Sequence, residues 1–364
     1  MIAAISGRAL AAAARRAGYG PLVADFFCDT DTVALAERAA MLPGDLQGGI
    51  DGARIIETLR QLAGDDRPVA IVLGSGFERM TETVDEIARH FPLAGNSGAA
   101  IRRIKDPQLL AADCAELGIP HPQFRWDRPP DPENWVVKTA GGAGGTHIRQ
   151  AAGETPATGR YFQRFVAGRS ISALFVGDGQ TADIVGFSQQ WASPAPAAPY
   201  RYGGAVRLRR FDRRQAGMIR GWLSGLARRA GLVGLCSADL IRGPDGYKLI
   251  EINPRPGATL DIFDDADAPL IEAHLRAAAG RAYQLPRFVD SMASMVTYAA
   301  APIAHFPSIA WPEWTADHQS PGTRLIAGDP VCTIFARGPS ADLTRRLIKG
   351  QASRLQHQWE GDRT

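Results

Sequence analysis

The first hundred residues alternate short apolar runs with helical stretches, and this rhythm restricts the fold more than any other feature of the sequence. The expected elements are strands over 2–6, 22–27 and 69–73 and helices over 8–17, 53–62 and 82–90. Strands that alternate with helices form a parallel sheet covered by helices. We therefore expect residues 1–98 to form a small doubly wound α/β domain.

The glycines of this unit do not fit a dinucleotide-binding loop. That motif requires GxGxxG directly after the first strand, where this chain has Ser6-Gly7-Arg8. The later Gly74-Ser75-Gly76 lacks the third glycine, because position 79 is Arg79. A nicotinamide-dependent enzyme is therefore disfavoured.

Composition places the chain among ordinary globular proteins. Its 364 residues are 45% hydrophobic and 22% charged, and a formal net charge of +3 is too small to indicate nucleic acid as the main partner. The four cysteines lack metal-ligand spacing, and no apolar run approaches the roughly 20 residues of a membrane span. We expect a cytoplasmic protein with reduced thiols that binds neither nucleic acid nor membrane.

The remainder divides into two further units. Asp106-Pro107 predicts the start of a helix that ends before Gly118, and 212–230 predicts a long amphipathic helix. We expect a second unit over 99–284. A β-rich extension is expected over 285–364.

A lysine before a glycine-rich loop is the sharpest local motif. A predicted strand carries Lys138, and the loop that follows contains Gly141, Gly142, Gly144 and Gly145. Glycines let backbone N–H groups close over anionic oxygens, so the loop suits phosphate. It is not a P-loop, in which the lysine follows the glycines and opens a helix. The alternative is a flexible hairpin with an incidental lysine.

Lysine is rare here, which gives each lysine more weight. Only four lysines stand among 41 lysines and arginines: Lys105, Lys138, Lys248 and Lys349. A lysine kept against that background marks a place that needs a compact point charge, unless it stands there by accident.

Residues 237–253 predict a β-hairpin whose turn sets its register. Pro244-Asp245-Gly246 is typical of a three-residue loop with Gly246 in a bulge, so Gly243 would face Tyr247. Side-chain alternation then directs three residues into the core. These are Leu240, Ile250 and Ile252.

The same register brings two acids together. Asp239 lies opposite Glu251, and Asn253 shares their face. Carboxylates at cross-strand distance repel unless a cation lies between them, and two carboxylates with an amide oxygen are a common Mg²⁺ ligand set. The sequence therefore predicts a Mg²⁺ site, the alternative being a solvent-facing hairpin with scattered acids.

The hairpin leads into Pro254-Arg255-Pro256-Gly257, a stiff segment that sets an arginine beside the expected metal. Such an arginine can stabilise charge on a phosphoryl group during transfer. The alternative is one surface arginine among many.

These motifs, in this order, resemble the ATP-grasp superfamily from about residue 102 to 261. The set comprises Lys105, Lys138 with its glycine loop, Gln163-Arg164-Phe165-Val166-Ala167-Gly168, Asp239 and Glu251-Ile252-Asn253-Pro254-Arg255. The resemblance implies a multidomain α/β and α+β fold. A doubly wound pre-ATP-grasp domain would precede the ATP-grasp fold, and a short β unit would follow it. The ATP-grasp fold itself would consist of a small lobe over 99–165 and a large lobe over 166–284.

The resemblance also implies roles for individual residues. Lys105 and Lys138 would contact ATP phosphates beneath the glycine loop, and Arg255 and Lys138 would act in catalysis. The inter-lobe hinge would receive adenine through Gln163, Arg164, Phe165 and Val166. Ser170 occupies the position of a glutamate that often binds ribose in the family, and Asp239, Glu251 and Asn253 would bind Mg²⁺.

Within the superfamily, Asp25, the Gly74–Glu78 loop and the C-terminal β unit look most like carboxylate–amine ligases related to tyramine–glutamate ligase. Those enzymes serve one-carbon cofactors of the methanofuran type. The implied reaction uses ATP and Mg²⁺ to convert a carboxylate into an acyl phosphate, from which an amine displaces phosphate.

Expected partners are the small-molecule carboxylate and amine and, in a homodimer, a second copy of the chain. Arg201, Tyr202 and Gly203 are candidate carboxylate anchors and Glu78 a candidate on the amine side, with a solvated basic loop as the alternative for the first three. Two other functions stay open: a bicarbonate-activating, carboxylase-like enzyme and a non-catalytic nucleotide-binding regulatory module.

Overall fold

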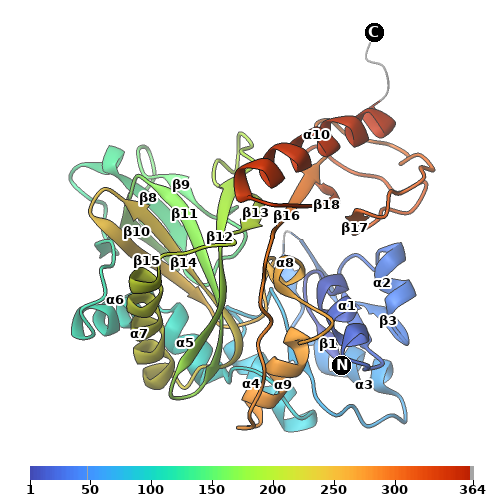
Figure 1. Cartoon of the computed structure of the whole chain (residues 1–364), viewed down its shortest axis with the longest axis horizontal. Coiled ribbons are helices and arrows are strands. Elements are labelled where there is room, and N and C mark those ends of the chain that lie inside the picture. The colour runs from blue at the N-terminus through green and yellow to red at the C-terminus, as the bar shows by residue number, and fades with distance from the viewer. Residues whose placement is uncertain (47, 361–364) are drawn as a thin grey trace.

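The chain begins with a four-stranded parallel sheet that has helices on both faces (Figure 1). The computed structural model describes residues 1–46 and 48–360. The strand order is β3-β2-β1-β6, and every pair is parallel. The elements are β1 (Ile2–Ala3), α1 (Arg8–Arg16), β2 (Leu22–Asp25), α2 (Thr30–Leu35), β3 (Arg38–Met41), β4 (Gly44–Asp45), β5 (Gly49–Ile50), α3 (Ile55–Ala63), β6 (Val72–Leu73) and α4 (Thr81–His90). The predicted doubly wound sheet is confirmed.

Two short helices and a small antiparallel sheet follow. The sheet order is β7-β10-β8-β9. The carboxylate of Asp106 accepts the N–H groups of Gln108 and Leu109 and so caps the helix predicted after it. The elements are α5 (Gly98–Lys105), α6 (Pro107–Glu116), β7 (Phe124–Arg125), β8 (Trp135–Thr139), β9 (Arg149–Gln150) and β10 (Arg160–Arg164), with a 3₁₀ turn at Pro132–Asn134.

An eight-stranded antiparallel sheet forms the body of the molecule. Its order is β15-β14-β11-β12-β13-β16-β18-β17. The predicted amphipathic helix is α7, which buries Ile219, Leu223 and Leu226 against one face. The elements up to residue 278 are β11 (Arg169–Asp178), β12 (Ala182–Ala192), β13 (Tyr202–Arg207), α7 (Arg213–Ala230), β14 (Val233–Gly243), β15 (Gly246–Asn253), α8 (Leu260–Phe263) and α9 (Leu270–Ala278).

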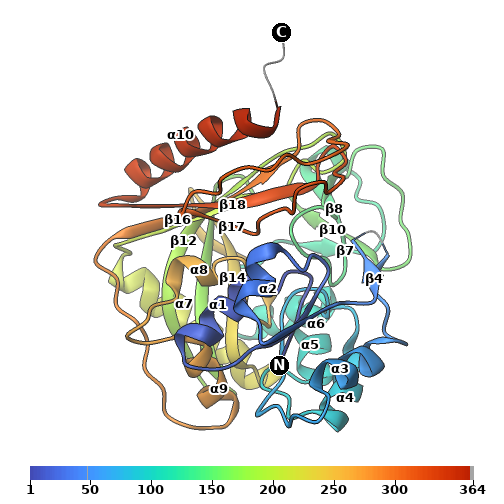
Figure 2. The ribbon, with the colours of Figure 1, turned by 90° about the vertical axis from the view of Figure 1, so that its right-hand side faces the viewer.

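The C-terminal residues extend this sheet rather than forming a separate one. β16 (Ser291–Tyr298) pairs with β13, and β18 (Pro330–Gly338) continues outward to β17 (Thr315–Ala316). Helix α10 (Ala341–Glu360) packs across β16 and β18 (Figure 2). The prediction of a short β unit therefore missed a 20-residue helix.

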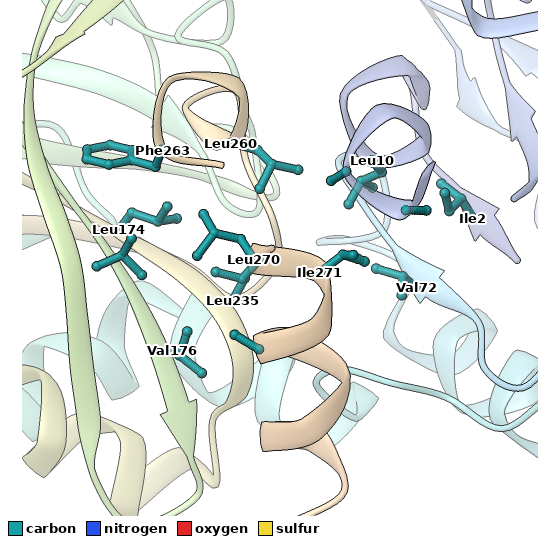
Figure 3. Packing of buried hydrophobic residues seen from close by; sticks show 14 of the residues in the cluster. Ile2, Leu10, Val72, Leu174, Val176, Leu235, Leu260, Phe263, Leu270 and Ile271 are labelled. Atoms are coloured by element: carbon teal, nitrogen blue, oxygen red, sulfur yellow. The ribbon is translucent and has the colours of Figure 1, made fainter. Parts of the chain in front are cut away.

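One hydrophobic core joins the N-terminal domain to the large sheet. Leu10 of α1 and Val72 of β6 meet Ile271 of α9, and the same cluster continues to Leu174 and Leu235 (Figure 3). Helices α8 and α9 therefore hold the two parts together. Within the described residues, no helix is long and apolar enough to cross a membrane.

The hairpin of β14 and β15 has the predicted pairing of acids but a different turn. Gly243 pairs with Gly246, so the loop has two residues, and the register shifts by one beyond Leu240. Ile250 is the extra residue, and Asp239 still faces Glu251. The predicted three-residue loop was wrong, and a bulge compensates for it.

The bulge also changes which side chains enter the core. Leu249, not Ile250, is fully buried opposite Leu240, whereas Ile250 is half-buried and shares the face of Glu251. Ile252 is buried as predicted.

Candidate active site

Two of the four lysines converge on one carboxylate. Lys105, the last residue of α5, and Lys138, on β8, place their Nζ atoms 4.0 and 3.9 Å from Glu251 Oε2. Lys138 is 3% exposed and donates to Gln163 Oε1 at 3.1 Å. Burial lowers the pKa of Lys138 and the charge of Lys105 adds to this, while Glu251 opposes it. The two lysines thus form a positive centre that an anionic ligand would stabilise.

Asp239 and Glu251 face each other across β14 and β15 beside this centre. Burial and the charge of Glu251 raise the pKa of Asp239 to about 6. Burial acts in the same direction on Glu251, but the nearby Lys105 and Lys138 outweigh it and lower its pKa. The two lysines therefore stabilise the negative charge of Asp239 less than that of Glu251.

The amide of Asn253 lies between the two acids. Its Nδ2 donates to Asp239 Oδ2 at 3.1 Å and to Glu251 Oε1 at 3.5 Å, and its Oδ1 accepts from Lys105. A partly positive N–H group thus stands between two carboxylates, which fits a place for a cation. Among the described residues no three His, Cys, Asp or Glu side chains gather around a metal site, so a Mg²⁺ ion here would need oxygen ligands from a nucleotide.

The glycine-rich loop lies between two other segments. The Gly144 carbonyl accepts from Tyr202 N at 2.9 Å, and a Cβ on Gly145 would lie 2.0 Å from the Tyr200 carbonyl oxygen. A Cβ on Gly141 would come within 3.3 Å of the Glu78 carbonyl. The loop therefore contacts both the N-terminal domain and the start of β13, and Gly142 lines a pocket with Glu251.

The predicted hinge connects the two antiparallel sheets. β10 ends at Arg164 and β11 begins at Arg169. The N–H groups of Arg164 and Phe165 donate to the carbonyls of Gln123 and Asn134, so neither is available to adenine. The Arg164 side chain points to Asp131. Among the described residues the Val166 N–H group has no hydrogen-bond acceptor, so it is the hinge donor that a ligand could still use.

Ser170 is linked to Asp239 indirectly, through Gln190. Its hydroxyl donates to Gln190 Oε1 at 3.3 Å, and Gln190 Nε2 donates to Asp239 Oδ1 at 3.3 Å.

Arg255 is held by Glu78. Arg255 Nε donates to Glu78 Oε1 at 2.8 Å, and Glu78 Oε2 accepts the Gly76 N–H at 2.8 Å. Burial would raise the pKa of Glu78, but the charges of Arg255 and Lys105 lower it. Glu78, which we expected on the amine side, thus forms a buried ion pair with the candidate catalytic arginine.

The predicted carboxylate anchors have partners within the protein. Arg201 donates to the carbonyls of Ser193 and Gly328 and stacks 3.6 Å from the ring centre of Tyr298. A Cβ on Gly203 would lie 2.7 Å from Ser193 N, so this glycine permits close strand packing. The Tyr202 hydroxyl is buried and has no hydrogen-bond partner among the described residues.

Sequence reasoning missed several pocket residues. His121, Tyr161 and Ile250 line the pocket with Lys105 and Glu251, and burial lowers the pKa of His121 to about 4. His147 also lies close to Glu251, and burial lowers its pKa to about 4. No local pattern marks these residues, because contacts distant in sequence bring them together.

Comparisons with known proteins concern the fold of the chain. The family model for the ATP-grasp domain matches residues 106–259. Biotin carboxylase from Campylobacter jejuni superposes with a TM-score of 0.72 at 14% identity, over 96% of this chain and 90% of that one. The L-amino acid ligase from Bacillus licheniformis gives 0.69 at 12%, over 96% and 95%. N5-carboxyaminoimidazole ribonucleotide synthetase gives 0.69 at 12%, over 96% and 94%.

At identities of 12–14%, these structural similarities show the fold alone. The predicted fold class is confirmed. Residues 106–259 form an ATP-grasp domain, and the chain has the fold of an ATP-grasp enzyme.

Proposed function

We propose that the protein is an ATP-dependent ligase that joins a carboxylate to an amine. A carboxylate oxygen of one substrate attacks the γ-phosphorus of ATP, and ADP leaves. The amine nitrogen then attacks the carbonyl carbon of the acyl phosphate, and phosphate leaves as the nitrogen gives up a proton. The convergence of Lys105 and Lys138 on the facing acids of β14 and β15 is the observation that carries this proposal.

Each residue of the candidate site has a role in this proposal. Lys138 and Lys105 bind phosphate oxygens under Gly141, Gly142, Gly144 and Gly145, while Asp239, Glu251 and Asn253 hold Mg²⁺. Arg255 stabilises the phosphoryl group during transfer. A bound Mg²⁺ supplies charge neutralisation on the phosphates, so catalysis consists of positioning and electrostatic stabilisation.

The finer proposal is an amino-acid ligase of the tyramine–glutamate type, acting in biosynthesis of a methanofuran-type cofactor. The resemblance of Asp25 and the 74–78 loop to that group supports it. A homodimer is also proposed, and the biotin carboxylase domain of 2-oxoglutarate carboxylase from Hydrogenobacter thermophilus is a dimer of this fold.

An ADP-release screen tests the proposal. Carboxylates including glutamate and tyrosine are crossed with amines including tyramine, each pair with Mg-ATP. We expect ADP only where one carboxylate and one amine are both present, together with an amide product of matching mass. ADP release that needs bicarbonate instead of an amine, or ATP binding without ADP across the panel, would contradict it.

Lys138→Met supplies the matched test of the site. No other lysine can take its position, so we expect the rate of ADP release to fall by about 100-fold or more while the far-ultraviolet circular dichroism stays unchanged. Lys349→Met, on the exposed surface of α10, is the control and should act like wild type. A Lys138→Met rate within threefold of wild type would remove Lys138 from the mechanism.

A further inference from the structure

The pocket beneath the glycine-rich loop contains a tyrosine whose hydroxyl has no partner inside the protein. Tyr161 lies on β10, in the small antiparallel sheet (Figure 1), and its side chain lines the pocket with Lys105, Gly142 and Glu251. Tyr161 is 8% exposed, and its hydroxyl makes no hydrogen bond within residues 1–46 and 48–360. Buried polar groups are normally hydrogen-bonded, so an unpaired one that lines a pocket indicates a ligand there.

The hydroxyl of Tyr161 is open to the pocket. In the described part of the chain, the unpaired hydroxyls that are completely enclosed include those of Ser172, Ser188 and Tyr202, but not that of Tyr161. The small exposed fraction of Tyr161 therefore includes its hydroxyl oxygen. Because the side chain lines the pocket, a ligand can reach this oxygen without a rotation of the ring.

Neighbouring side chains hold the ring in this position. Trp126 packs edge-on against Tyr161 with ring centres 6.3 Å apart, and its indole N–H donates to Gln108 Oε1 at 3.4 Å. On the other side, Tyr161 faces Lys138 directly across β10 and β8, so the two side chains share one face of the sheet. The aromatic ring is therefore fixed between a tryptophan and a lysine.

The charges around the pocket favour an anionic ligand. The Nζ atoms of Lys105 and Lys138 lie 4.0 and 3.9 Å from Glu251 Oε2. Glu251 is the only acid among the residues that line the pocket. Two lysines around one lining carboxylate attract a ligand that carries negative charge.

The uncharged groups of the pocket are hydrogen-bond donors. Burial and the charge of Glu251 raise the pKa of Tyr161, so its hydroxyl keeps its proton and can donate it. Lys138 can only donate, so Gln163 accepts from it through Oε1 and keeps Nε2 as a donor. Gln163 lines the same pocket, two residues after Tyr161 on the same face of β10. Several donors beside two lysines match a ligand with several acceptor oxygens, such as a phosphate.

We infer that the Tyr161 hydroxyl donates a hydrogen bond to a phosphate oxygen of the bound nucleotide. This inference rests on the proposed function in one respect, because the nucleotide is the ATP assigned to this pocket. Lys105 and Lys138 supply charge to the phosphates. The neutral hydroxyl of Tyr161 adds a directional hydrogen bond to one of their oxygens.

Tyr161→Phe removes the hydroxyl and keeps the ring. Calorimetry measures the Kd of Mg-ATP for the full chain without carboxylate or amine, so that no turnover occurs. We expect the Kd to rise at least tenfold, because the lost hydrogen bond is to a charged group. An unchanged Kd would overturn the inference.

Tyr247→Phe is the matched control. Tyr247 is also buried, and its hydroxyl likewise makes no hydrogen bond to any described residue, but it does not line the pocket. Tyr247→Phe should therefore bind Mg-ATP like the wild type. A tenfold loss in this variant too would mean that removal of any buried tyrosine hydroxyl weakens binding, and it would overturn the assignment to Tyr161.

The Tm without ligand separates a binding role from a structural one. Tyr161→Phe loses no hydrogen bond within the protein, so its Tm should lie within about 1 °C of wild type or above it. A Tm lower by several degrees would show that the hydroxyl stabilises the fold and would contradict the inference.

Other ligands locate the contact on the nucleotide. An equal loss of affinity for Mg-ADP and Mg-ATP would place the hydroxyl on the α- or β-phosphate, and a loss for Mg-ATP alone would place it on the γ-phosphate. Adenosine carries no phosphate, so its affinity should be the same for wild type and Tyr161→Phe. An equal loss for adenosine would place the hydroxyl on the nucleoside and refute the phosphate contact.

Failure of this inference differs from failure of the proposed function. If wild type and Tyr161→Phe bind Mg-ATP equally well, only the role of Tyr161 is wrong. If Mg-ATP binds but no pair of carboxylate and amine releases ADP, only the ligase proposal is wrong. A wild type that does not bind Mg-ATP would contradict both.

Discussion

At the scale of single residues, Glu78 illustrates how a distant part of the chain can position a side chain that we propose to be catalytic. It lies 177 positions before Arg255, yet it is the buried partner of that arginine. Because Glu78 also accepts the Gly76 N–H, the loop after β6 fixes the direction of the guanidinium. Glu78 is therefore a positioning residue.

Glu78→Ala should lower kcat by about 30-fold and leave the KM of ATP within twofold, since the arginine stays charged but loses its orientation. Glu78→Gln keeps an oxygen that can accept from Arg255 Nε, so it should restore part of kcat. Steady-state kinetics give both values, and the exposed neighbour Glu82→Ala is the control. A rise in KM for ATP with unchanged kcat would mean that Glu78 acts on nucleotide binding instead.

The local sequence predicted which residue types gather at the site but not every partner of each. Lys105, Lys138, Asp239, Glu251 and Asn253 do lie together, because strand alternation and turn chemistry are local rules. The Glu78–Arg255 and Arg201–Gly328 contacts join residues more than a hundred positions apart, for which a single sequence holds no local signal.

At the scale of elements, the bulge in β15 places two consecutive side chains on one face. Glu251 faces Asp239, and Ile250 and Glu251 both line the pocket that also contains Lys105 and Gly142. The turn prediction and the true turn differ by one residue, and the bulge restores the predicted pairing of the acids. The position of the bulge could not be predicted from the sequence, because it depends on packing against the rest of the sheet.

Deleting Ile250 should therefore make the ladder regular and keep Asp239 opposite Glu251. We expect an unchanged Mg²⁺ requirement and a KM for ATP raised about tenfold, because an apolar wall of the pocket is lost. Ile250→Ala should give a similar change, and Ile241→Ala, outside the pocket on β14, should not. Loss of the Mg²⁺ requirement in the deletion variant would show that the bulge itself orients Glu251.

The glycine loop offers a matched pair of substitutions. Gly144 and Gly145 both have left-handed backbone angles, with φ of 67° and 72°, so alanine strains both alike. A Cβ meets nothing within 4 Å at Gly144 but comes 2.0 Å from the Tyr200 carbonyl at Gly145. Gly145→Ala should therefore weaken Mg-ATP binding at least fivefold more than Gly144→Ala, as measured by calorimetry. Equal losses would mean that contact with Tyr200 does not fix the loop.

At the scale of the whole molecule, His274 joins the N-terminal domain to the large sheet. Its Nδ1 accepts the Leu235 N–H at 2.8 Å, and its Nε2 faces the Ala94 carbonyl at 2.9 Å, so the ring is neutral. Burial lowers its pKa to about 4. Protonation of His274 Nδ1 would place its N–H group against the Leu235 N–H group and break this hydrogen bond.

Stability should therefore depend on pH at this junction. In the unfolded chain His274 is protonated below about pH 6.5, whereas in the folded chain it is protonated only near pH 4. The contribution of His274 to the free energy of unfolding is therefore complete above pH 6.5. This contribution to the free energy of unfolding falls by about 3 kcal/mol as the pH drops to 4. Urea unfolding at pH 7.5, 6 and 5 should show a smaller decline for His274→Gln than for wild type. The exposed His305→Gln is the control, and parallel declines in wild type and His274→Gln would refute the assignment.

The overall architecture was predictable where periodicity is strong. The parallel sheet and α7 follow from alternation and helical spacing. The sequence did not predict that β16, β17 and β18 join the large sheet. Pairing between strands that are distant in sequence produces no pattern in either segment.

The core shared by α1 and α9 has a consequence for synthesis on the ribosome. The apolar face of α1 cannot be buried until Leu270, Ile271 and Ala273 have been synthesised, roughly 260 residues later. At about 5 to 20 residues per second, that delay is on the order of 15 to 50 s. During that interval the nascent N-terminal domain exposes an unfinished surface, so a chaperone that shields it should raise the yield of native protein made in a cell-free translation reaction.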